Sequence, residues 1–178
     1  LSDHKGNYWI GTRTGGLNKF DYSKKIFTAY NHNPSNNNSI ISNSIQSLLE
    51  DRAGNIWIGT YSSGLDMLNP QTGAFTHYTN HPSDPGSLSD NRVYSLVEDK
   101  LGNIWIGTYG GGLNKLDRAT GKFLRYQFNE NSTASISSNA TWSLALDDEG
   151  NLWIGTFGGG VNVLNLNNQK FNYYKNNP

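Results

Sequence analysis

The sequence lacks cysteine, long apolar runs and an excess of charge of either sign. Without cysteine, no disulfide framework and no thiolate metal site can form. Its apolar runs are far shorter than the roughly 18 residues of a membrane-spanning helix, and no basic-then-apolar leader precedes them, so we expect no direct membrane insertion. The chain starts at Leu1 without a methionine, as we would expect of an excised or processed segment.

The 14 Lys and Arg residues balance the 14 Asp and Glu residues, so there is no global basic field to hold a phosphate backbone. We therefore expect no nucleic-acid partner. The composition is unusual in its 20 glycines, 10 tyrosines and 5 tryptophans, and it contains many asparagines and serines. This mixture is rich in turn formers and aromatics and has few runs of helix formers, which predicts an all-β fold.

The tryptophans reveal an internal repeat of 48 residues. The string D-x-x-G-N-x-W-I-G-T recurs at 3–12, 51–60, 99–108 and 147–156. Further identical registers are a glycine, a phenylalanine and a tyrosine, namely Gly16, Gly64, Gly112 and Gly160; Phe27, Phe75, Phe123 and Phe171; and Tyr30, Tyr78, Tyr126 and Tyr174.

Each period contains four short β-like runs, at 92–98, 103–109, 112–118 and 122–128 in the third copy. Short glycine-containing connections between them predict an antiparallel meander, and loops of about a dozen residues, such as 31–43, join successive units. Ile104 and Ile106 point to one face of such a sheet and Trp105 to the other. A sheet that is apolar on both faces must be covered on both, and radial stacking of sheets as the blades of a β-propeller achieves this.

The expected fold is therefore an all-β propeller fragment of four-stranded antiparallel blades, about 3.75 blades in all, spanning residues 1–178. Blade one (1–30) lacks its first strand. The other blades are expected at 44–78, 92–126 and 140–174, with long loops between them.

The repeat I-x-S-L-x-E-D-x-x-G-N-I-W-I-G-T-x-x-G-G-L-N-K-L-D resembles the two-component regulator propeller repeat, over nearly the whole chain. The resemblance implies a periplasmic, glycan-responsive sensor region of a bacterial hybrid two-component system, like those of gut Bacteroidetes. It also implies a parent chain with a membrane helix, a histidine kinase and a DNA-binding output. Sensors of this family have more than four blades, so the remaining blades of the parent chain are expected partners.

The local motifs predict structure more than chemistry. In D-x-x-G-N we expect Asp51 and its equivalents to accept backbone N–H groups, with Gly54 or Asn55 at positive φ, rather than a calcium loop. The glycines at 110–112 predict a tight hairpin or bulge, because no helix follows to make a phosphate cradle. The recurrence of the tryptophans favours an inter-blade core over sugar stacking.

No motif predicts a metal, a cofactor or a catalytic residue. His77 and His81 lie on a strand end and a Pro-bounded loop, where a spacing of four gives no common face. The acidic residues at 147–149 belong to a solvated hairpin, and no nucleophile, histidine and acid converge. We therefore expect this segment not to be an enzyme, although the implied parent chain carries a histidine kinase.

The candidate ligand-binding residues lie where the repeat departs from its consensus while keeping conspicuous side chains. One register follows Gly-Thr at the end of strand two, and the other lies near the start of strand one, where Gln46 also falls. Blade topology brings both registers to one side near the central mouth, where aromatic and Arg side chains suit a contact surface. The alternative is that these are partly exposed aromatics that merely pack under the long loops. The candidates are Arg13, Tyr61, Tyr109, Phe157, Arg92, Tyr94 and Trp142.

The leading hypothesis is a sensor input module that recognises a carbohydrate, with an oligosaccharide as ligand, or a partner domain, and that signals by dimer rearrangement. The alternatives are a propeller-fold enzyme acting on glycans, such as a glycosidase or lyase, and a passive protein-interaction scaffold. A fold alone does not decide between them. We also expect self-association, because both ends of a partial ring expose apolar blade faces.

Overall fold

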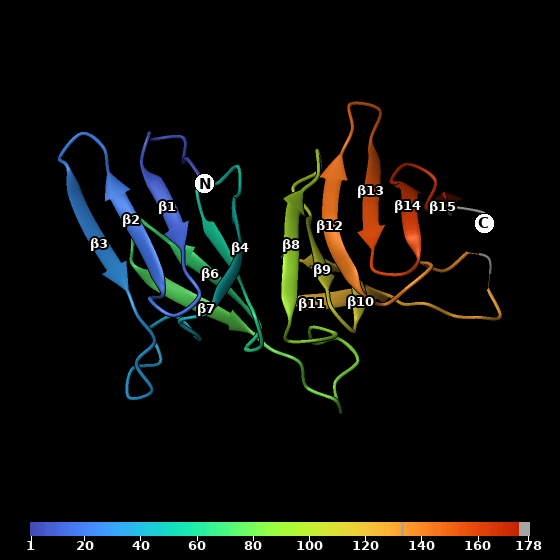
Figure 1. The fold of residues 1–178 in the computed structure, drawn as a ribbon, viewed down its shortest axis with the longest axis horizontal. Helices are drawn as coiled ribbons and strands as arrows, with labels where there is room; N and C mark the ends of the chain where they lie inside the picture. The colour runs from blue at the N-terminus through green and yellow to red at the C-terminus, as the bar shows by residue number, and fades with distance from the viewer. Residues whose placement is uncertain (133, 175–178) are drawn as a thin grey trace. The chain divides into compact units, whose positions relative to one another are not determined.

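The computed structural model describes residues 1–132 and 134–174, and all of its regular structure is β-strand (Figure 1). Among these residues, no helix is long and apolar enough to cross a membrane. The strands are β1 (Tyr8–Gly11), β2 (Leu17–Asp21), β3 (Ile26–Tyr30), β4 (Ile45–Glu50), β5 (Ile56–Thr60), β6 (Leu65–Asn69), β7 (Ala74–Tyr78), β8 (Val93–Glu98), β9 (Ile104–Thr108), β10 (Gly112–Asp117), β11 (Lys122–Tyr126), β12 (Thr141–Leu146), β13 (Asn151–Thr156), β14 (Gly160–Asn165) and β15 (Lys170–Tyr174).

The strands form four antiparallel meanders, in which each strand pairs with its neighbours in sequence. The first sheet has three strands, β1 to β3, and the other three sheets have four strands each, β4 to β7, β8 to β11 and β12 to β15. The predicted series of three complete blades preceded by one without its first strand is therefore confirmed. In the third copy, each strand boundary lies within two residues of its predicted position.

The chain divides into two compact units. One comprises residues 1–79 with 91–93 and contains the first two sheets, and the other comprises 80–90 with the residues from 94 onward and contains the last two.

A single carboxylate organises the first hairpin of every repeat. Asp99 Oδ1 accepts the backbone N–H groups of Leu101 and Asn103, each at 2.9 Å, while Oδ2 accepts the indole Nε1–H of Trp105 at 2.8 Å. Gly102 takes the positive φ, at 83°. The predicted turn role is confirmed, with glycine rather than asparagine in the left-handed region. The bond to the indole was not predicted. The same carboxylate-to-indole bond recurs at Asp3, Asp51 and Asp147.

Within each unit, the repeated tryptophan of one sheet packs against the strands of the next. Trp9 shares a core cluster with Ile56, Ile58 and Leu68, and Trp105 shares one with residues at the same registers of the last sheet. Gly107 allows this close approach, because a Cβ atom there would lie 2.7 Å from Thr141 Cγ2 of β12. These contacts confirm the inter-blade role for Trp9 and Trp105.

The fourth tryptophan differs from the other three. Trp9, Trp57 and Trp105 are at most 1% exposed, whereas Trp153 is 40% exposed. The expectation that all four are buried was wrong for Trp153, because within the described residues no further sheet packs on its face.

Candidate ligand-binding site

A β-bulge sets the start of the first strand in two of the sheets. In the last sheet the pairing passes from Thr141 opposite Thr156 to Ser143 opposite Gly155, which leaves Trp142 as the extra residue. Gln46 is the extra residue at the same register of β4. A bulge turns the side chain of its extra residue away from the regular alternation of the strand, and bulges are common beside binding sites. One of the two registers predicted from sequence is therefore a point of local irregularity.

The second predicted register lies beside the first. Phe157 directly follows β13, and its backbone N–H donates to the carbonyl of Ala140 at 2.8 Å, so the chain passes next to the start of β12. Tyr61 donates in the same way to Ser44, at 3.0 Å. Side chains at the ends of the second strands are thus held next to those at the starts of the first strands, as the blade topology predicts.

Four of the seven candidate residues form one continuous group, which we call the aromatic shelf: Tyr94, Tyr109, Trp142 and Phe157. The ring centroids of Tyr94 and Trp142 lie 6.0 Å apart with an interplanar angle of 22°, and those of Trp142 and Phe157 lie 5.0 Å apart at 20°. Tyr109 stacks on Tyr94 at 5.6 Å. The rings therefore lie roughly parallel to one another, in offset contacts of the kind that aromatic pairs favour.

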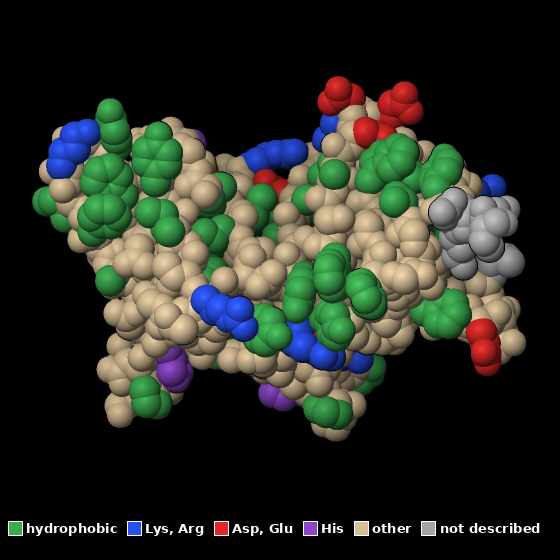
Figure 2. All heavy atoms as spheres, in the orientation of Figure 1, with side chains coloured by type: hydrophobic (Ala, Val, Ile, Leu, Met, Phe, Trp, Pro, Cys, Tyr) green, Lys and Arg blue, Asp and Glu red, His purple; other side chains and the backbone are tan. Residues whose placement is uncertain are grey.

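The shelf is open to solvent. Trp142 is 46% exposed and Phe157 is 61% exposed, while the two tyrosines are half-buried. Hydrophobic side chains gather on the face seen in Figure 2, over the part of the molecule where Figure 1 draws the lower ends of β8 and β12. Trp142 and Phe157 thus keep accessible ring surface, as expected both of a contact surface and of partly exposed aromatics under the long loops.

The remaining candidates belong to the first unit. The guanidinium carbon of Arg13 lies 6.0 Å from the centroid of the Tyr61 ring, a cation–π contact in which both side chains are exposed. Arg92 directly precedes β8 and is half-buried. The structure therefore joins Tyr94, Tyr109, Trp142 and Phe157 in one group and Arg13 and Tyr61 in another.

The long loops are fastened to the sheets by side chains that the sequence pattern did not reveal. Ser89 N–H donates to Asn114 Oδ1 at 3.0 Å, and Ser137 N–H donates to Asn162 Oδ1 at 2.9 Å. Ser137 also donates to the carbonyl of Gly159 at 2.8 Å, which ties this loop to the hairpin that carries Phe157. The loops and these hairpins therefore share one end of the sheet.

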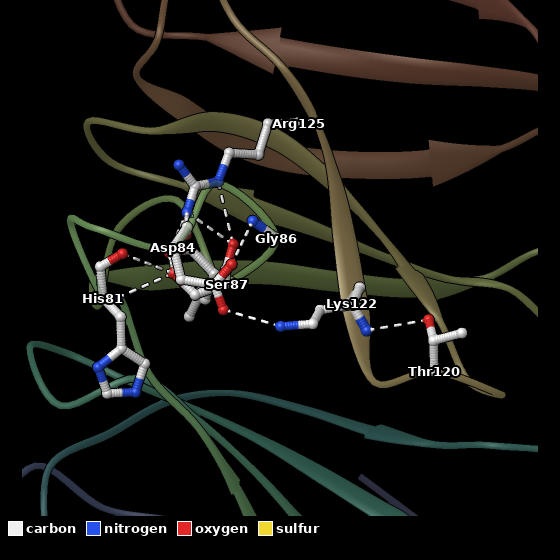
Figure 3. Close-up of polar contacts among 8 residues, drawn as sticks. His81, Asp84, Gly86, Ser87, Thr120, Lys122 and Arg125 are labelled. Atoms are coloured by element: carbon white, nitrogen blue, oxygen red, sulfur yellow. Dashed lines mark hydrogen bonds and ion pairs between the residues drawn. The ribbon is translucent and has the colours of Figure 1, made fainter.

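On the fourth strand of each complete sheet, the side chain at one equivalent position holds the preceding long loop. The residue type at this position differs from repeat to repeat. In the third repeat, Arg125 donates to the carbonyls of Asp84 and Ser87, at 3.0 and 2.8 Å, while Lys122 pairs with the Asp84 carboxylate at 2.8 Å (Figure 3). In the fourth repeat, the hydroxyl of Tyr173 donates to the Ser135 carbonyl. In the second repeat the residue at this register is His77.

His77 is held between two oxygen atoms. Its Nδ1 lies 2.7 Å from Asp66 Oδ1, and its Nε2 lies 2.8 Å from the carbonyl oxygen of Asn37. Burial raises the pKa of Asp66. Burial acts to lower the pKa of His77, but the bonds to Asp66 and Asn37 outweigh it and leave that pKa raised. Because both ring nitrogens face oxygen acceptors, the protonated imidazolium fits this site best.

Three repeats match a known family directly. The sequence profile described as the two-component regulator propeller matches residues 39–62, 87–110 and 135–158. The chain belongs to the two-component regulator propeller family. The resemblance and the β-propeller fold inferred from the repeat are thereby confirmed.

Solved structures agree with this family assignment. The extracellular domain of a hybrid two-component system, BT3049 of B. thetaiotaomicron, is 32% identical, with a TM-score of 0.84 over 98% of this chain and 24% of that one. The extracellular domain of the one-component system BT4673 from the same organism is 25% identical, with a TM-score of 0.74 over 100% of this chain and 24% of that one. This propeller segment thus spans about a quarter of either domain.

A third similar structure belongs to an enzyme. Virginiamycin B lyase of Staphylococcus aureus is 16% identical, with a TM-score of 0.73 over 99% of this chain and 54% of that one. At this identity the likeness shows the fold alone. No curated protein matches the propeller segment.

Proposed function

We propose that this chain is a ligand-sensing module in the periplasmic sensor region of a two-component histidine kinase, and that the aromatic shelf binds a carbohydrate without turning it over. The observation that carries the proposal is the shelf itself, four aromatic rings in mutual contact, two of them open to solvent. Membership of the propeller family, and the likeness to extracellular domains of two-component and one-component systems, support the sensory role.

A sugar fits the chemistry of the shelf. The C–H faces of a pyranose ring are flat and apolar, so they pack on aromatic rings, and burial of such surface is favourable by about 25 cal/mol per Å². Aromatic anchors also contribute a large share of binding energy at protein contact surfaces. Arg13 beside Tyr61 offers a second combination, a ring with a guanidinium group. A charged hydrogen bond from that group to a uronate or sulfate would contribute about 1.5–3 kcal/mol.

The position of the most acidic hairpin supports binding without turnover. Asp148 and Glu149 lie in the hairpin between β12 and β13, whereas Trp142 and Phe157 lie at the opposite ends of these strands. Strands of this length separate the two ends by roughly 15–20 Å. Glycosidase carboxylates must flank the bond that they cleave, within roughly 5–9.5 Å of each other. The acidic hairpin therefore does not serve a sugar bound on the shelf.

The test is calorimetric titration of the chain with neutral and uronate-containing oligosaccharides. We expect Trp142→Ala to weaken binding at least about tenfold, which corresponds to about 1.4 kcal/mol, and Tyr109→Ala to weaken it by a similar factor. Tyr22→Ala is the matched control, because Tyr22 is exposed to a similar degree but lies far along the chain from the shelf residues. It should leave the affinity unchanged, and all three variants should keep the melting temperature of the parent.

Two results would count against the proposal. Equal affinities of the parent and Trp142→Ala would remove the shelf as the binding surface. Release of shortened sugars by the unmutated protein, followed by chromatography, would show an enzyme in place of a sensor module.

A further inference from the structure

The three long loops that precede the complete sheets share one internal hydrogen-bond pattern. In each loop a serine hydroxyl donates to the backbone carbonyl six residues earlier, at 3.0 or 3.1 Å, and the serine N–H donates to the carbonyl three residues earlier. These serines are Ser39, Ser87 and Ser135. The same backbone arrangement therefore recurs beside the fourth strand of each complete sheet.

In the third repeat, this loop holds a guanidinium group of the chain itself. Arg125 of β11 donates to the carbonyls of Asp84 and Ser87, at 3.0 and 2.8 Å, and to the Ser87 hydroxyl at 2.9 Å (Figure 3). A guanidinium has only donors, and the loop supplies oxygen acceptors at matching positions. The loop fold is therefore suited to binding this group.

In the fourth repeat, the equivalent position is a cavity of about 380 Å³, which we call the loop pocket. At the register of Arg125 stands Tyr173, whose hydroxyl donates to the carbonyl of Ser135, the equivalent of Ser87. Phe128, Glu130 and Ser132 also line the cavity. Its volume lies in the range of small-molecule sites. The aromatic walls are accessible, since Phe128 is 48% and Tyr173 is 36% exposed.

The loop pocket lies on the side of the last sheet that faces the preceding sheet. Tyr173 and Ile154 both pair with Asn162, so their side chains share one face. Ile154 belongs to the core cluster of Trp105, which places this face against the third sheet. In the second repeat, the equivalent cavity is lined by the preceding loop and by His77, with no described residue of a later repeat. A further blade would therefore cover the opposite face and leave the loop pocket open.

Two lining residues distinguish the fourth-repeat loop from the other two. Glu130 stands where both other loops have proline, and Phe128 stands where they have histidine and asparagine. Glu130 is exposed, and its carboxylate has no ion-pair partner within the described part of the chain. A carboxylate beside two aromatic rings favours a cation over a neutral ligand.

We propose that the loop pocket binds a guanidinium group from outside the chain, in the way that the third-repeat loop binds Arg125. The carbonyl of Ser132 occupies the register of the Asp84 carbonyl and accepts one N–H group. The carboxylate of Glu130 pairs with the charge, and the planar group stacks on the exposed ring of Phe128. The site is independent of the proposed function, because it shares no residue with the aromatic shelf.

The experiment is a nuclear magnetic resonance titration of the ¹⁵N-labelled chain with N-acetyl-argininamide. We expect saturable shifts of amides 128–132 and 134–136. The matched probe is N-acetyl-citrullinamide, which has nearly the same shape but no charge. It should bind at least about tenfold more weakly, because it offers no charge to the carboxylate or to the rings.

Two substitutions of Tyr173 test the comparison with the third repeat. Tyr173→Arg supplies the fourth-repeat loop with a guanidinium of its own, so it should fill the loop pocket and abolish binding of the probe. Tyr173→Phe is its control, because it keeps the ring and releases the Ser135 carbonyl. It should bind the probe at least as tightly as the parent. Circular dichroism checks that both variants are folded.

The carboxylate is tested separately. Glu130→Gln should weaken binding by about three- to fivefold, as for removal of an exposed ion pair. Glu149→Gln, the same change at an exposed residue of the hairpin between β12 and β13, should leave the affinity unchanged.

A glycine-flanked arginine peptide distinguishes two sources of the group. Tighter binding of the peptide than of N-acetyl-argininamide would indicate an arginine side chain of a partner protein, and equal binding would indicate a small guanidino compound. Three results would overturn the proposal: no saturable shifts, equal affinity for the citrulline derivative, or undiminished binding by Tyr173→Arg.

Discussion

The aspartate that opens each repeat acts through its charge. Burial alone would raise the pKa of Asp99, but the hydrogen bonds from Trp105, Asn103 and Leu101 outweigh it and leave that pKa below 3.8. The bond from Trp153 and those from Asn151 lower the pKa of Asp147 to about 2. A carboxylate is well suited to accept these N–H groups, since both of its oxygens are acceptors. The ionised form therefore links the hairpin to the tryptophan that covers the next sheet.

Replacing Asp99 by asparagine removes the charge of this side chain while nearly keeping its shape. The amide is nearly isosteric, but its NH₂ group must face an N–H donor, so we expect a loss of about 2–4 kcal/mol in the free energy of unfolding at neutral pH. Since the folded pKa is depressed, this stabilisation is present above about pH 4 and is lost as the pH falls through the folded pKa. Urea unfolding at pH 7 and near pH 3 measures both effects.

Asp117→Asn is the matched control for this experiment. Asp117 also accepts backbone N–H groups in a turn, but its register already holds asparagine in two repeats, as Asn69 and Asn165. We expect this control to leave the free energy of unfolding essentially unchanged. If the two substitutions were equally harmless, the carboxylate would not be the organising group of the hairpin.

At the scale of the loops, three different side chains stand at one register, and one of them is a histidine, which titrates near neutral pH. The raised pKa of Tyr173 keeps that phenol neutral over the physiological range, whereas His77 titrates there. A neutral His77 would leave one ring nitrogen lone pair facing an oxygen of Asp66 or Asn37. His32 lies near enough to Asp66 to act on the pKa of that carboxyl, which it lowers. The fastening of loop 31–44 is therefore pH-dependent in a way that the other two loops are not.

We expect loop 31–44 to loosen as the pH rises through the folded pKa of His77. That pKa is raised above 6.5, so the stabilisation is fully present below about pH 6.5 and is lost above it. The raised pKa of Asp66 has the same sign, since burial penalises its ionised form. Hydrogen exchange of amides 37–41 between about pH 6 and 8, corrected for intrinsic rates, should show increased opening.

The control for this loop lies in the same molecule. Amides 84–89, held by Arg125, should show no such change, and His77→Arg should abolish the pH dependence of the first loop. Parallel behaviour of the two loops across this range would contradict the assigned role of His77.

These features differ in how far the sequence could predict them. The strand order and the neighbourhood of Tyr94, Tyr109, Trp142 and Phe157 were predictable, because identical registers fixed the topology and the topology placed the exceptions together. The loop fasteners were not, since Ala29, His77, Arg125 and Tyr173 share no chemistry that a repeat comparison could detect. The exposure of Trp153 was also missed, because its sequence context matches that of three buried tryptophans.

At the scale of the whole molecule, the two sheets within each unit stabilise each other by packing together, as neighbouring repeats do in other repeat proteins. The same residue type at the same register therefore contributes differently according to whether a sheet covers it. Ile58 is fully buried against Trp9, whereas Ile10, at the equivalent register, is 44% exposed.

Truncating these two isoleucines gives the final prediction. Ile58→Ala should lower the free energy of unfolding by about 2–4 kcal/mol, because it removes buried apolar surface and leaves a cavity beside Trp9. Ile10→Ala should cost less than about 1 kcal/mol, since this side chain is already 44% exposed. Urea unfolding of the two variants measures both losses. An equal loss of stability from both substitutions would mean that Ile10 is covered as completely as Ile58, and would contradict the dependence of this register on a neighbouring sheet.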